Sequence, residues 1–201
     1  MLNRPHELGV TLIELIVGIA IVSILLMVGL PSFGLWIQNA QVRTAAESVQ
    51  NGLQVARSEA VRRNANVRFT LSNANGRVEW SVGCVIERDT CPAVIQTRNA
   101  TEGGVNGRVG VSTDIPPAVV PANQYSTALA AGVGLSGEGG AGVTFSSLGM
   151  MANPAVDVHR IDVTNSSTAD ARRLVIIIGS GGLTRMCDPR LTLSENPQGC
   201  S

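Results

Sequence analysis

The sequence predicts an α+β fold in which one long N-terminal helix packs on an antiparallel β-sheet head. Two observations support this prediction. An apolar run from Val10 to Leu30 continues into an amphipathic stretch that reaches Arg63. After Asn64 the apolar residues change from helical spacing to the alternation that is typical of strands. Since the chain has 201 residues, it has room for one modest head domain beyond the helix.

The first half of the predicted helix is long and apolar enough to cross a bilayer. Between residues 10 and 30 only Thr11, Glu14 and Ser23 are strongly polar, and a helix of that length spans about 31 Å. A cleaved secretory signal is the competing interpretation, but its apolar region is shorter and carries no acid. A plain membrane anchor also stays open. Neither alternative explains Glu14, because a carboxylate in a bilayer costs roughly 2.5 to 3.5 kcal/mol.

The second half of the predicted helix, residues 31–63, is amphipathic. Apolar residues recur there at steps of three and four, which predicts one buried stripe: Val42, Ala46, Val49, Leu53, Ala56 and Ala60. Pro31 has no amide proton and crowds the preceding turn, so a kink is expected at that residue. Arg62 and Arg63 suit a helix C-terminus, where cations meet the negative end of the helix dipole.

Residues 64–201 form the predicted β-rich head. Short runs of β-prone residues alternate there with Gly- and Pro-rich connections. A single antiparallel sheet packed on the helix is the simplest arrangement of these runs. The predicted strands are Val67–Leu71, Val78–Val82, Val94–Thr97, Val143–Phe145, Val158–Thr164 and Arg173–Ile178.

Four cysteines lie in the head: Cys84, Cys91, Cys187 and Cys200. An even number of cysteines beyond a membrane anchor indicates disulfides in an oxidising compartment. Of the three pairing schemes we favour the local one, Cys84 with Cys91 and Cys187 with Cys200, each worth roughly 2.5 to 3 kcal/mol by loop entropy. Zinc binding is disfavoured, because the spacings lack the close CxxC pairs of zinc sites. No metal and no cofactor are expected.

The sequence does not indicate an enzyme. His159 lies in an alternating strand pattern, and no GxSxG motif accompanies the many serines. Gly132 to Gly137 satisfies GxGxxG, but Gly-rich, β-prone sequence follows where a dinucleotide fold needs a helix. The charges balance, with fifteen basic residues, all arginine, against fifteen acidic ones, so composition does not point to a polyanion partner. A membrane-anchored periplasmic enzyme is therefore the least favoured class.

The segment Gly9-Val10-Thr11-Leu12-Ile13-Glu14 resembles the processing site of type IV pilins and type II secretion pseudopilins. The resemblance implies that residues 1–9 are a leader, that a prepilin peptidase cuts between Gly9 and Val10, and that Val10 is then N-methylated. The family usually has Phe where Val10 stands. Glu14 becomes the fifth mature residue and pairs with a new α-ammonium group, because unpaired ions are disfavoured in lipid.

This resemblance also implies a location and partners. The chain is expected in the bacterial inner membrane as a single-pass protein with its head in the periplasm, and later in a filament. The expected partners are other pilin or pseudopilin subunits, through the N-terminal helix, the prepilin peptidase and an inner-membrane assembly platform.

A narrower resemblance lies at the end of the helix. The residues from Leu53 to Asn64, LQVARSEAVRRN, are similar to the helix end of the GspH/FimT family of pseudopilins and minor pilins. This implies a type IV pilin-like fold and a structural role, as a tip or priming subunit of a type II secretion pseudopilus or a type IV pilus. For each single residue in the segment, a surface charge on an amphipathic helix is the simpler interpretation.

The stretch from Arg172 to Pro189 resembles the C-terminal strand of FimT-like minor pilins, in which a GRxR motif before a cysteine is implicated in DNA uptake. Here that motif reads Gly182-Leu183-Thr184-Arg185, so only Arg185 carries over. Arg172, Arg173 and Arg190 would have to supply the missing charge. DNA binding during natural transformation is therefore the alternative function, and solvated arginines beside a disulfide are the simpler interpretation.

Overall fold

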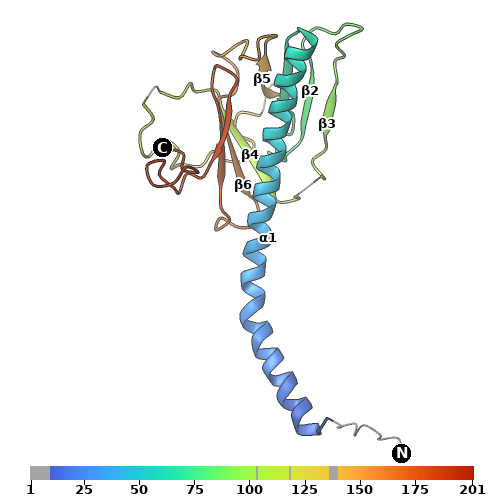
Figure 1. Ribbon diagram of the computed structural model, residues 1–201, viewed down its shortest axis with the longest axis vertical. Helices are drawn as coiled ribbons and strands as arrows, with labels where there is room; N and C mark the ends of the chain where they lie inside the picture. Colours follow the sequence, from blue (N-terminus) through green and yellow to red (C-terminus); the bar gives the residue numbers. More distant parts are fainter. Residues whose placement is uncertain (1–9, 103, 118, 136–139) are drawn as a thin grey trace, which may run out of the picture. The chain divides into compact units, whose positions relative to one another are not determined.

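The computed structural model describes residues 10–102, 104–117, 119–135 and 140–201, and only the backbone of residues 28–32. The chain forms two units, Met1–Ile37 and Gln38–Ser201. Helix α1, Leu12–Arg63, belongs to both units (Figure 1). It begins two residues later than the sequence predicts and ends at the predicted residue, where Asn64 adopts a left-handed φ of 49°. The helix is continuous through Pro31, and the kink stays a prediction.

In the first unit, the described apolar side chains of α1 are exposed. Leu12, Ile13, Ile24, Leu25 and Met27 all expose 65% or more of their surface. In the part of the chain that the structure describes, no helix combines the length and the apolar character needed to cross a membrane.

The second unit contains two antiparallel four-stranded sheets rather than the single sheet that we predicted. Sheet A has the order β3-β2-β1-β5 and sheet B has the order β4-β6-β7-β8. Their strands are β1 Val67–Leu71, β2 Trp80–Cys84, β3 Gln96–Arg98, β4 Gly107–Ser112, β5 Ala141–Phe145, β6 Arg160–Asn165, β7 Leu174–Ile178 and β8 Thr184–Cys187.

The predicted apolar stripe of α1 is confirmed: all six of its residues, from Val42 to Ala60, are fully buried. They pack in one core with residues of both sheets. The helix lies close to sheet A at Gly52, where an added Cβ would lie 2.6 Å from the Phe69 ring. Nearby, the Trp80 indole donates to the Ser48 hydroxyl over 3.0 Å.

The second unit carries its own hydrophobic core. Among the described residues, every buried side chain lies at Val42 or beyond. Because a unit with a complete core can fold by itself, a fragment of residues 38–201, called the head fragment below, is suitable for experiments.

Candidate functional site

The start of helix α1 is the first candidate site. The Thr11 hydroxyl accepts the Glu14 backbone N–H at 3.4 Å, and Glu14 is the acid of the first turn. Thr11-x-x-Glu14 therefore has the spacing of a capping box, in which the N-cap hydroxyl satisfies a free amide and the acid complements the helix dipole. Val10 and the Glu14 side chain are exposed. Gly9, on the other side of the predicted cleavage site, lies outside the described residues.

Two arginines at the end of helix α1 connect the helix to other parts of the head. Arg57 donates from Nε to the Gly149 carbonyl over 2.9 Å, which joins α1 to the turn after β5. Glu59 contacts Arg62 and Arg63, each at 2.6 Å, and the hydrogen bond from Arg62 is the main cause that lowers the pKa of Glu59. Arg63 also donates to the Thr90 carbonyl. The sequence predicted surface charges here and missed these contacts.

Both disulfides of the head follow the local scheme. Cys84 is bonded to Cys91, with the two Cα atoms 5.7 Å apart, and Cys187 is bonded to Cys200, with the Cα atoms 5.0 Å apart. The first closes the loop that Arg63 contacts, and the second fixes the C-terminal tail beside β8. In the described residues no group of histidine, cysteine and acidic side chains could hold a metal ion.

The second candidate site is the face of sheet B that is turned away from α1. The strand register aligns Arg160 with Ile177 and Arg185, and in the adjacent row Asp162 with Val175 and Cys187. Tyr125, in the loop between β4 and β5, packs on this face against Val175 and both cysteines of the second disulfide. The loop and the C-terminal tail thus cover much of this face.

Asp162 is the centre of the charges on this face. It is fully buried and accepts two hydrogen bonds from Arg160, at 2.7 and 2.9 Å, one from Arg173 and one from the backbone of Leu129 at 3.0 Å. The Arg160 guanidinium also lies 5.2 Å from the centre of the Tyr125 ring. Burial raises the pKa of Tyr125, and Arg160 and Arg185 oppose that shift. One carboxylate therefore neutralises two buried guanidinium groups only in part.

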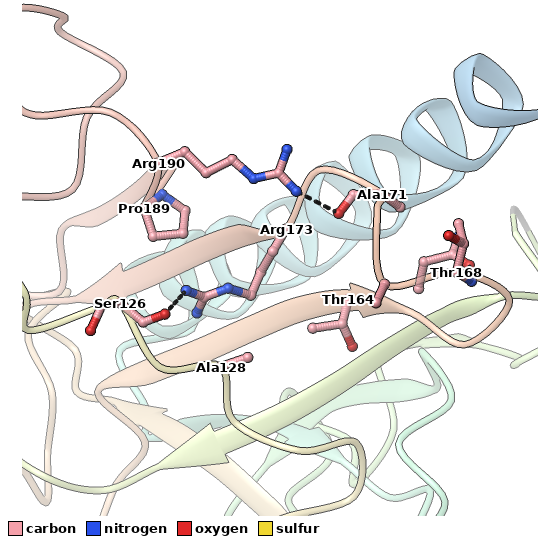
Figure 2. A pocket seen from close by; sticks show the side chains of 10 residues that line it. Ser126, Ala128, Thr164, Thr168, Ala171, Arg173, Pro189 and Arg190 are labelled. Carbon is pink, nitrogen blue, oxygen red and sulfur yellow. Dashed lines mark hydrogen bonds between the residues drawn. The ribbon is translucent and has the colours of Figure 1, made fainter. Parts of the chain in front are cut away.

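The four arginines proposed for DNA lie near one another on sheet B and its tail, but each has a partner within the head. Arg172 forms an ion pair with the buried Asp188, and Arg173 pairs with Asp162. Arg185 donates to the Gly199 carbonyl, and Arg190 donates to the Ala171 carbonyl over 3.1 Å (Figure 2). Leu183, in the place of the motif arginine, is 71% exposed.

His159 is fully buried at the start of β6. Its Nδ1 lies 3.0 Å from the Ile178 carbonyl and its Nε2 lies 2.7 Å from the Pro154 carbonyl. Both ring nitrogens thus face backbone carbonyl oxygens, and neither faces a hydroxyl that it could activate. The contacts of His159 therefore connect backbone segments of the head.

Comparison with known proteins gives two family matches, one at the start of the chain and one over most of the rest. Residues 45–182 match the family model described as type II transport protein GspH, and residues 4–30 match the prokaryotic N-terminal methylation motif. Among solved structures, two crystal forms of the type IV minor pilin FimU of Pseudomonas aeruginosa are similar. They have 17% and 16% identity and TM-scores of 0.45 and 0.47, and the matches cover 74% and 75% of this chain and 94% and 90% of the other. No curated protein matches.

Proposed function

The chain belongs to the family of type II transport protein GspH, and we propose that it is a tip or priming subunit of a type II secretion pseudopilus or a type IV pilus. The family is one of structural pilin subunits, not of enzymes. The observation that carries the proposal is that one chain matches both the GspH model, over residues 45–182, and the N-terminal methylation motif, over residues 4–30.

The N-terminal match supports a maturation pathway for this chain. We propose that residues 1–9 are removed as a leader, that the cut falls between Gly9 and Val10, and that Val10 is N-methylated. The new α-ammonium group would belong to Val10, five residues before Leu15. It would therefore be surrounded by apolar groups, either in lipid or in a filament. Glu14 is the acid of the first turn of α1, so it is placed to neutralise that charge.

Before assembly, we propose, residues 10–30 anchor the chain in the inner membrane with the head in the periplasm. The exposed apolar side chains of α1 support this location, because an apolar surface of that length needs lipid or protein around it. The two disulfides agree with an oxidising compartment. The same apolar surface would then contact other subunits, and the prepilin peptidase and the assembly platform would act on the chain before that.

A gene deletion separates the two filament systems. We expect the deletion to reduce either the secretion of type II substrates or the number of surface pili, because loss of a priming subunit prevents filament initiation. The full chain should restore the lost activity. The head fragment, exported with an unrelated signal peptide, should not, since it lacks the segment that contacts other subunits. Normal secretion and normal piliation in the deletion strain would refute the proposal.

DNA binding is the alternative function, and its test is a gel shift with the head fragment at low and moderate salt. We expect no shift at moderate salt, because Arg172 and Arg173 are ion-paired, Arg185 is bound to the C-terminal tail and the chain has no net charge. A shift that the Arg185→Ala variant abolishes would contradict this expectation and establish the alternative. Arg43, on the exposed surface of α1, provides the control variant Arg43→Ala.

A further inference from the structure

The outer face of sheet B carries more positive than negative charge around Tyr125. Arg160 and Arg173 share the single carboxylate of Asp162. The positive charge of Arg185 also acts on Tyr125, where it tends to lower the pKa of the hydroxyl. The Tyr125 side chain is 3% exposed, and its hydroxyl has no hydrogen-bond partner among the described residues. An excess of partly buried guanidinium groups favours an anion where this face is open to solvent.

A pocket of about 480 Å³ opens on this face (Figure 2). The loop after Tyr125, the end of β6, the loop before β7 and the start of the C-terminal tail form its walls. Arg173 and Arg190 both line it. In Figure 2 the Arg190 side chain extends across the pocket toward Ala171, and Arg173 reaches toward Ser126.

Arg190 is the arginine of this pocket whose charge is not neutralised by an ion pair. Its guanidinium donates to the carbonyls of Asp170 and Ala171, at 3.4 and 3.1 Å, and no carboxylate of the described residues lies within salt-bridge distance of it. The Asp188 carboxylate accepts the backbone N–H of Arg190 with one oxygen and pairs with the Arg172 guanidinium through the other. Arg173 is held in position by Asp162 and by the carbonyls of Tyr125 and Ser126.

The remaining lining limits what kind of anion fits. The walls include the small apolar residues Ala128, Ala171 and Pro189, and also the hydroxyl-bearing residues Ser126 and Thr164. This lining suits a compact group with one negative charge, a short apolar body and a few hydrogen-bonding atoms. We propose that the pocket binds the C-terminal carboxylate of a partner polypeptide, with Arg190 as the anion-binding group and Arg173 beside it in the wall.

A nucleic-acid backbone suits this pocket less well. Phosphodiester chains bind through several cations along a track, whereas Arg172 is paired with Asp188 and Arg185 is bound to the C-terminal tail.

The test is a titration of the ¹⁵N-labelled head fragment with acetyl-Ala-Ala-Ala, followed by NMR. We expect saturable shifts of the amide signals of Ser126, Ala128 and Ala171 with the free acid and none with the C-terminal amide. The Arg190→Gln variant should bind at least about tenfold more weakly, since a hydrogen bond to a charged group is lost. Arg190→Lys should retain part of the affinity. The control Arg43→Gln should bind like the wild type.

Three outcomes would overturn the proposal. They are equal shifts with the acid and the amide, unchanged binding by Arg190→Gln, and binding of inorganic phosphate or a dinucleotide in preference to the peptide acid. A preference for the dinucleotide would assign the pocket to nucleic acid, and a preference for inorganic phosphate would assign it to a free phosphate. The experiment uses the head fragment alone, so its result is independent of the filament role proposed above.

Discussion

Replacing Glu14 with valine is expected to remove the protein from filaments while leaving its cleavage intact. The reason is electrostatic: after cleavage, Val10 carries an α-ammonium group, and an unpaired ion in apolar surroundings is costly. A cost of roughly 2.5 to 3.5 kcal/mol corresponds to a loss of about a hundredfold in incorporation. The measurement is the ratio of the protein in sheared filaments to that in membranes, by immunoblot.

Two further variants separate the charge of Glu14 from its position in the capping box. Glu14→Gln preserves a capping-box residue but removes the charge, so the proposal predicts that it fails like the valine variant. Ser23→Ala is the matched control, since Ser23 only donates to the Ile19 carbonyl of its own helix, over 2.8 Å. It should assemble normally. If the glutamine variant assembled like the wild type, helix capping would be the role of Glu14.

Replacing Asp162 with asparagine is expected to destabilise the head fragment by about 3 kcal/mol or more, because two guanidinium groups then lose their carboxylate in a buried site. The side chains of Arg160 and Arg173 expose only 14% and 13% of their surface, so water compensates little. Urea unfolding followed by circular dichroism measures the loss.

The chain offers a control and a rescue for this variant. Glu47→Gln breaks the ion pair between Glu47 and Arg43. Because these side chains are 53% and 75% exposed, the change should cost less than about 0.5 kcal/mol of stability. Adding Arg173→Met to Asp162→Asn removes one of the two unpaired charges and should recover part of the stability. An Asp162→Asn variant as stable as Glu47→Gln would show that this carboxylate does not hold the face together.

The helix was predictable from the sequence because its signal is local. A buried stripe with a period near 3.6 marks the half from Val42 to Ala60, and that stripe is buried as expected. Two strands, β4 and β8, were not predicted from the sequence, and both lack such a local signal. In β4, Gly107 and Gly110 replace side chains where the backbone comes close to other segments: an added Cβ on Gly110 would lie 2.3 Å from the Ala130 carbonyl. In β8, the strand is short and follows a Gly-rich turn.

The charges of the head were not predictable, because their partners are far apart in the chain. Arg68 pairs with the buried Asp157 across 89 residues, at 3.1 Å, and Arg173 pairs with Asp162 from the next strand. A sequence shows such residues as separate surface charges, and only the register of the sheet brings them together. For the same reason the sequence suggested four arginines for DNA but not the acids and carbonyls that bind them.

The intact mass of the protein purified from its native membrane shows whether the chain is processed as a filament subunit. We expect a chain that begins at Val10, carries one N-terminal methyl group, and lacks the four hydrogens that two disulfides remove. Tandem mass spectrometry of the N-terminal peptide then locates the methyl group on the Val10 nitrogen. An uncut chain that begins at Met1, or a cut at any other bond, would contradict the assignment of this chain as a processed filament subunit.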